Sequence, residues 1–274
     1  MKITLSLKSP VIKPLIPIEA ELISPDVFVN KELDEIKQLS IWRGNKEIPL
    51  CEVIDIKFEG QKEENPENIE IILNGDFSRF KRIGQFMSAG SIVANGPVGM
   101  HLGFKMSGGK IVIKGNTDDF AGANMEGGEI HIQGNAGHYL GGSIRGEWRG
   151  MSKGKIKVEG NVGNECGVWM RNGLIEILGN TNIFLGMHLH RGTIIVHGDV
   201  AERVGAEMTG GTIVILGKVK DVLPSFEFKS KKSEIEFEDY GKLKGPFLEF
   251  EGDFAERKQG TLYLLEKKNE HLLY

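Results

Sequence analysis

Glycines recur at nineteen-residue intervals through the middle of the chain. The first glycine of each copy is found at Gly84, Gly103, Gly122, Gly141, Gly167, Gly186 and Gly205. A second follows at Gly90, Gly109, Gly128, Gly154, Gly173, Gly192 and Gly211, and a third at Gly96, Gly115, Gly134, Gly160, Gly179, Gly198 and Gly217. A unit this short cannot close a hydrophobic core alone, so successive copies must stack on one another.

The stretch between the second and third glycines predicts a strand with one buried face, because apolar residues alternate there. One position holds isoleucine in every copy: Ile92, Ile111, Ile130, Ile156, Ile175, Ile194 and Ile213. The other inward position holds alanine, isoleucine or valine. Identical positions should lie directly above one another in the stack, and the residues after the third glycine should form a ladder at one corner: Asn116, Asn135, Asn161, Asn180 and Asp199.

These patterns predict a mainly β protein, a right-handed parallel β-helix of about seven 19-residue coils. We expect a small α+β unit over residues 1–68, the glycine-rich solenoid over 69–217, and a C-terminal cap or tail over 218–274. Segments without the repeat are natural caps for the open ends of such a stack. The C-terminal segment could instead fold along the side of the rod.

Two copies are longer than the others and should bulge outward at corners. Two extra residues lie between Gly75 and Gly84, and seven more lie near residues 146–152. The second insertion contains Trp148 flanked by Arg145 and Arg149, a composition typical of interface anchors. Trp148 could equally fold back onto its own coil.

The outward position between the two buried strand positions also suggests a binding surface. It is apolar at both ends of the repeat region, at Val93, Val112, Ile195 and Val214, and polar between them. Apolar outward residues need a cover, supplied by the terminal segments or by other proteins. We therefore add these four residues to the hypothetical partner interface.

Composition excludes several functions. The net charge is −4 and no basic block is present, so nucleic acid is not an expected partner. No apolar run is long enough for a membrane span or a signal peptide, which leads us to expect a cytoplasmic protein without a membrane partner. Two cysteines, Cys51 and Cys166, are too few for an iron–sulfur cluster.

Motifs for catalysis are weak. Gly108-Gly109-Lys110 resembles part of a phosphate loop, but Ile111 replaces the serine or threonine that would bind magnesium. Paired carboxylates, a nucleophile elbow and a serine or cysteine triad are not evident. A low-ranking metal candidate combines His188, His190 and Glu207, although Arg171 would lie beside the cation. We assign no catalytic or cofactor-binding residue, and a metal site remains the weaker alternative to a solvated or interface patch.

Two copies carry a family resemblance: Met106-Ser-Gly-Gly-Lys-Ile-Val-Ile-Lys-Gly115 and Met125-Glu-Gly-Gly-Glu-Ile-His-Ile-Gln-Gly134. They resemble the glycine-rich β-helix at the carboxyl end of the glutamate synthase large subunit. The chain as a whole resembles the C subunit of formylmethanofuran dehydrogenase from methane-producing archaea, since it has a separate amino-terminal unit and no amidotransferase or flavin-binding region.

The second resemblance implies a subunit of a complex that reduces carbon dioxide and transfers the formyl group to methanofuran. In that family other subunits carry the molybdenum- or tungsten-pterin, the iron–sulfur clusters and a dinuclear metal site, and the C subunit is a non-catalytic component that holds catalytic chains. The alternatives are a stand-alone glutamate synthase-type subunit in amide nitrogen transfer, and a carbohydrate-active or metal-dependent β-helix enzyme.

Overall fold

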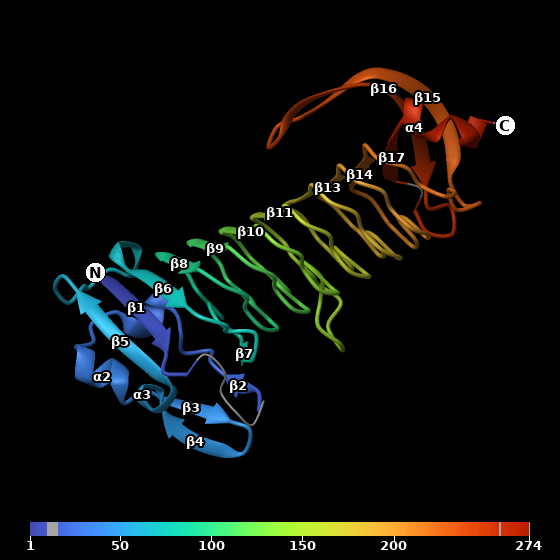
Figure 1. The fold of residues 1–274 in the computed structure, drawn as a ribbon. Helices are drawn as coiled ribbons and strands as arrows, with labels where there is room; N and C mark the ends of the chain where they lie inside the picture. Colours follow the sequence, from blue (N-terminus) through green and yellow to red (C-terminus); the bar gives the residue numbers. More distant parts are fainter. Residues whose placement is uncertain (10–15, 258, 274) are drawn as a thin grey trace.

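The computed structural model describes residues 1–9, 16–257 and 259–273. The protein is mainly β, as expected, and most of its strands belong to one large sheet. The strands of this sheet are ordered β15-β16-β17-β14-β13-β12-β11-β10-β9-β8-β6-β1-β5. Figure 1 shows the resulting row of stacked coils, with the amino-terminal unit at one end and a long carboxyl-terminal hairpin at the other.

Each repeat contributes one strand to the middle of the sheet. These strands are β8 (Ser91–Ala94), β9 (Lys110–Ile113), β10 (Glu129–Ile132), β11 (Lys155–Val158), β12 (Leu174–Ile177), β13 (Thr193–Val196) and β14 (Thr212–Ile215). Neighbours pair in parallel and in register, so that Ile92 lies beside Ile111 and Ile194 beside Ile213. This confirms that equivalent isoleucines stack, and they are buried in one continuous core.

The corners after β9 to β13 are held by the expected ladder. The side-chain oxygen of Asn116 accepts a hydrogen bond from the backbone N–H of Asn135 at 2.8 Å, and Asn135 accepts one from Asn161 at 2.8 Å. The same contact continues through Asn180 and Asp199 down to the N–H of Lys218. The side chains therefore satisfy backbone donors of the next coil, rather than pairing amide with amide.

The amino-terminal unit continues the stack instead of simply covering it. β1 (Lys2–Leu7) pairs in parallel with β6 (Glu70–Asn74) and antiparallel with β5 (Ile54–Glu59), which ends the sheet. A second, four-stranded sheet is ordered β4-β3-β2-β7. Its strands are β2 (Ile18–Glu19), β3 (Ser40–Arg43), β4 (Lys46–Pro49) and β7 (Phe80–Lys81).

Short helices complete this unit: α1 (Pro25–Phe28), α2 (Leu33–Lys37), α3 (Leu50–Val53) and a 3-10 turn at Pro66–Asn68. The strand expected over Glu19–Ile23 is confined to β2, because the chain turns at residue 21. Between Gly75 and Gly84, Ser78 and Arg79 are exposed, in keeping with the expected outward bulge. Phe80 in the same stretch is 1% exposed and belongs to β7, which pairs with β2.

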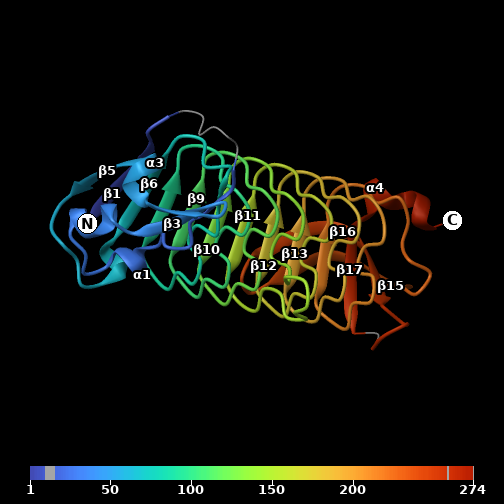
Figure 2. The same cartoon turned by 90° about the horizontal axis from the view of Figure 1, so that it is seen from below.

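The carboxyl-terminal segment both extends the sheet and folds along its outer side. β17 (Gly260–Leu265) pairs in parallel with β14, so the parallel stack runs beyond residue 217. β15 (Glu227–Phe237) and β16 (Gly241–Gly252) form a long antiparallel hairpin that arches back over the coils (Figures 1 and 2). α4 (Glu266–Asn269) and a 3-10 turn at Glu270–Leu273 follow. Among the described residues, no helix is long and apolar enough to cross a membrane.

Candidate functional site

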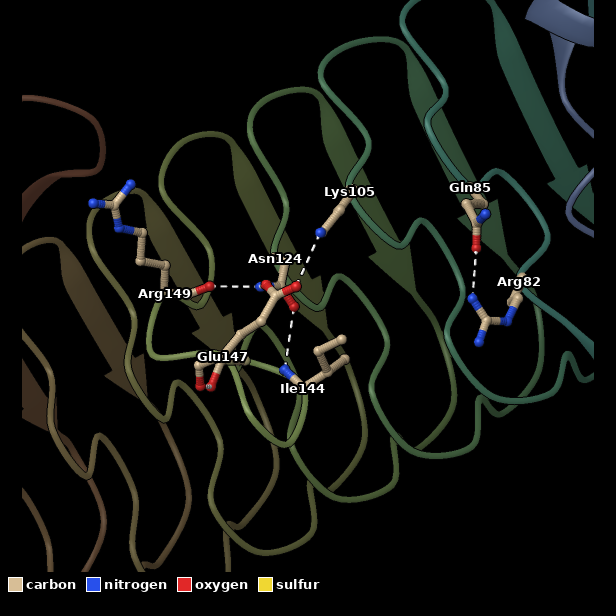
Figure 3. Close-up of polar contacts among 8 residues, drawn as sticks. Arg82, Gln85, Lys105, Asn124, Ile144, Glu147 and Arg149 are labelled. Carbon is tan, nitrogen blue, oxygen red and sulfur yellow. Dashed lines mark hydrogen bonds and ion pairs between the residues drawn. The ribbon is translucent and has the colours of Figure 1, made fainter.

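The insertion after Gly141 is fastened to the stack by two polar side chains, Asn124 and Glu147. The Asn124 amide donates to the Glu147 carboxylate at 2.5 Å and to the Arg149 carbonyl at 2.6 Å, and its oxygen accepts from the Ile144 N–H at 3.2 Å. Lys105, one coil earlier, pairs with Glu147 at 3.1 Å (Figure 3). Asn124 itself is 6% exposed. The insertion is thus held in one position rather than attached only at its two ends.

This fixed loop presents Trp148 to solvent. The ring is 54% exposed, and the guanidinium carbons of Arg149 and Arg171 lie 4.5 and 4.9 Å from its centre. Arg171 also donates to the Trp148 carbonyl at 2.9 Å. The backbone of Trp148 is tied to the next coil while its side chain stays exposed, so its role as an interface anchor remains a prediction. We call Trp148, Arg149 and Arg171 the loop patch.

The loop patch and its surroundings carry positive charge that no acid among the described residues neutralises. Among the described residues, Arg145, Arg149, Arg171 and Arg191 make no ion pair, whereas many of the lysines do. The Nε of Arg171 is buried and has no hydrogen-bond partner among the described residues. Burial and the neighbouring Arg149 lower the pKa of Arg171.

The metal candidate is not assembled as three converging ligands. His188 stacks on Trp169 with ring centres 3.8 Å apart, and its Nε2 lies 3.5 Å from Glu207. His190 instead bonds Thr209 at 2.9 Å, and burial together with Arg171 and other arginines lowers its pKa. No group of three His, Cys, Asp or Glu side chains suited to a metal ion is found in the described part of the chain.

A column of stacked rings next to the loop was missed by the sequence analysis. His101, Phe120 and Tyr139 occupy the position two residues before the first glycine in consecutive copies. Their rings are nearly parallel, with centres 4.9 Å apart for His101 and Phe120 and 4.6 Å for Phe120 and Tyr139. All three have positive φ, between 60° and 63°. Three ring side chains at one repeat position were the available signal.

These rings form the floor of a groove of about 530 Å³ that we call the aromatic groove. It is lined by Arg82, Met100, His101, Phe104, Asp119, Phe120, Tyr139, Ile144 and Arg145. Burial, with Arg82 and Lys81 nearby, lowers the pKa of His101 and so favours its neutral ring. The Nδ1 atom of His101 is buried and has no hydrogen-bond partner among the described residues.

The four apolar residues of the outward strand position fall into two groups. Val93 and Val112 are partly exposed and remain candidates for a partner surface. Ile195 and Val214 are 0% exposed beneath the β15–β16 hairpin, where they pack with Ile235 and Phe247. Their assignment to a partner interface is wrong, because the chain covers them itself.

The chain matches a family model described as the GXGXG motif over residues 78–239, more than half of its length. The C subunit of tungsten-containing formylmethanofuran dehydrogenase 2 from Methanococcus maripaludis is 52% identical over 264 residues, covering 94% of this chain and 95% of the relative. The chain belongs to the family of formylmethanofuran dehydrogenase C subunits. The comparison therefore supports the resemblance to these C subunits rather than the resemblance to the glutamate synthase large subunit.

Other members of this C-subunit family match over a shorter range. The Methanothermobacter wolfeii protein is 43% identical over 91 residues, which cover 33% of this chain and 33% of that relative. A solved structure confirms the fold at lower identity: the formyltransferase/hydrolase complex FhcABCD from Methylorubrum extorquens, in complex with methylofuran. One chain of it superposes with a TM-score of 0.79 at 24% identity, over 96% of this chain and 99% of its own length.

Proposed function

We propose that this chain is a non-catalytic scaffold subunit of a formylmethanofuran dehydrogenase complex, which reduces carbon dioxide and transfers the formyl group to methanofuran, the first step of methanogenesis from carbon dioxide. Its partners are the catalytic and electron-carrying subunits. The observation that carries the proposal is the 52% identity to a C subunit over 94% of the chain.

The shape of the molecule supports a scaffolding role. In-register strands and the side-chain ladder join every coil to its neighbours, as in a right-handed parallel β-helix, and such stacks offer long rigid surfaces. The loop patch projects from this surface with tryptophan and arginine, the residues most enriched in interface hot spots. An acidic partner would neutralise guanidinium groups that the chain leaves unpaired.

The cofactors of the complex belong, on this proposal, to the partner subunits: a molybdenum or tungsten pterin, iron–sulfur clusters and a dinuclear metal site. The donors of this chain do not fit an iron–sulfur cluster, which takes four cysteine thiolates. Its two cysteines lie apart in the fold, Cys51 in α3 and Cys166 in the stack. Cys166 is 0% exposed, and burial raises the pKa of its thiol.

The proposal is tested by purifying the tagged chain from a host that makes the complete complex. The wild-type chain should co-purify with the pterin-containing subunit and with the subunit that holds the dinuclear metal site, both identified by mass spectrometry. Trp148→Ala should reduce their recovery at least tenfold, because hot-spot truncations commonly cost about 2 kcal/mol or more. Trp42→Ala is the matched control, since Trp42 is 46% exposed in β3 of the amino-terminal unit.

Wild-type chain that purifies alone, under conditions where the other subunits are present and folded, would refute the scaffold role. If Trp148→Ala and Trp42→Ala reduced the recovery of the other subunits equally, the scaffold role would stand but the loop patch would not be part of the interface. A purified chain that turns over formylmethanofuran unaided would contradict its non-catalytic assignment.

A further inference from the structure

We propose that the aromatic groove is a docking site for an extended, acidic segment of a partner polypeptide. This inference rests on the proposed function, since it names one contact within the assembly. It concerns a surface beside the loop patch, to which the same insertion contributes. Three observations carry it: the orientation of the rings, the unequal use of the two arginines that line the groove, and a tyrosine hydroxyl without a partner among the described residues.

The rings present their edges to the groove. His101, Phe120 and Tyr139 stack with interplanar angles of 13° and 7°, so the faces between them are covered by one another. A planar aromatic ligand that needs an open ring face finds none between these three side chains. The edges of aromatic rings are electropositive and attract oxygen atoms. Backbone carbonyls and carboxylates therefore suit this floor better than another ring does.

Two guanidinium groups line the groove, Arg82 from the first coil and Arg145 from the insertion. Arg82 is already engaged, because its Nε lies 3.1 Å from Glu19. One of its NH groups also lies 3.1 Å from the Gln85 oxygen, as Figure 3 shows. Arg145 is exposed and, among the described residues, makes no hydrogen bond or ion pair. Arg145 is the group with full capacity for a bidentate carboxylate contact.

The length of the groove suits an extended peptide. Arg82 and Tyr139 lie three coils apart, which is about 14 Å at the usual spacing of strands. Extended chain covers that distance in about four residues. Such a segment could place one carboxylate at Arg145 and another toward Arg82, with apolar side chains over Met100 and Ile144.

One polar group of the groove offers a partner to the backbone of that segment. The partly exposed Tyr139 has a hydroxyl that makes no hydrogen bond within the described part of the chain. Asp119 brings one negative charge against the two arginines of the lining, and one of its oxygens accepts from the His138 N–H at 2.7 Å. The groove therefore combines net positive charge with unused hydrogen-bonding capacity.

Site-specific photo-crosslinking in the intact complex tests the proposal. Benzoylphenylalanine is placed at Phe120, within the groove, and at Phe184, which occupies the same repeat position two coils beyond the insertion. We expect position 120 to crosslink to another subunit at least tenfold more than position 184. The captured peptide should contain at least two carboxylates within about five residues, as the groove length requires.

The scaffold role is tested separately, by recovery of the complex with the wild-type chain. A wrong docking site can therefore be distinguished from a wrong proposed function. The proposal is overturned if the complex assembles but position 120 captures nothing, captures a second copy of this chain, or captures a segment without acidic residues. A bound small molecule that is lost from the Phe120 variant would overturn it as well.

A charge reversal gives a second measurement that does not depend on the crosslinker. Arg145→Glu should weaken binding of the partner subunits at least tenfold and reduce the salt dependence of that binding. Arg203→Glu is the matched control, because Arg203 lies over Phe184 outside the groove, 5.4 Å from its ring centre. Equal effects of the two reversals, with both variants folded, would contradict a specific site at the groove.

Discussion

The two ends of the outward strand position differ in how they are covered. At the carboxyl end, Ile195 and Val214 are fully buried under the hairpin formed by β15 and β16. At the amino end, Val93 and Val112 stay partly exposed, although they occupy the same position in the same sheet. The chain covers one end of this strip with its own residues and leaves the other end open.

The edge of the covered region is marked by a polar cluster. Near the end of the hairpin, Tyr240 donates from its hydroxyl to Glu176 at 2.8 Å. His197 and Lys157 also contact the Glu176 carboxylate, both at 3.1 Å. Beyond this cluster the outward position is polar, with His131 bonded to Glu159 at 2.8 Å. An apolar outward strip therefore predicts that another segment or protein packs on it, but it does not identify that segment.

The sharpest test of this difference is the same substitution at two valines. Val214→Lys should lower the free energy of unfolding by about 3 kcal/mol or more, because a buried ammonium without a partner is placed under the hairpin. Val112→Lys should change it by less than about 1 kcal/mol, because the lysine can reach water. Chemical denaturation followed by circular dichroism measures both. A similar loss in the two variants would show that Val112 is covered as well.

A smaller effect is expected at the polar cluster. Tyr240→Phe removes the hydrogen bond to Glu176 and should lower the free energy of local opening of the hairpin by about 1 kcal/mol. Hydrogen exchange of β15 and β16 measures that opening. Tyr139→Phe is the matched control, because the Tyr139 hydroxyl has no partner in the described residues. Unchanged exchange in Tyr240→Phe would mean that apolar packing alone holds the hairpin.

The repeat made the central sheet predictable from sequence. Ile92 and Ile111 had to stack because glycines keep a constant spacing on either side of them, and Asn135 and Asn161 followed from the same register. The terminal units have no such internal copy. The position of β17 beside β14 depends on a return of the chain over more than forty residues, and no local pattern specifies that pairing.

The site was predictable only where a side chain departed from the repeat. Trp148 stood out because it lies in an insertion, and it is exposed on the surface. The column of rings was not predicted because His101, Phe120 and Tyr139 are different residue types, and the same repeat position is charged at Glu165 and Arg203. The burial of Ile195 could not be read from its own coil, since it depends on Phe247, a residue far along the chain.

The contact between the hairpin and Glu176 should also depend weakly on pH. Burial raises the pKa of Glu176, but hydrogen bonds from Tyr240 and Lys157 outweigh it and hold the pKa below its ordinary value of 4.5. A carboxyl whose pKa is lowered by folding stabilises the native state above its unfolded value, and that contribution is lost as the pH falls through the folded value. Tyr240 remains a donor throughout, because burial and Glu176 raise its pKa to about 12.

We therefore expect hydrogen exchange of the hairpin, corrected for the intrinsic pH dependence of exchange, to show constant protection from pH 7 down to about 4.5 and decreasing protection at lower pH. Glu176→Gln should remove most of that decrease, because glutamine does not titrate. Protection of β8 and β9, which lie outside the hairpin's cover, should change less over the same range. A wild-type hairpin whose protection falls between pH 7 and 5 would indicate a different titrating group, and an unaltered decrease in Glu176→Gln would show that the carboxylate does not hold the hairpin in place.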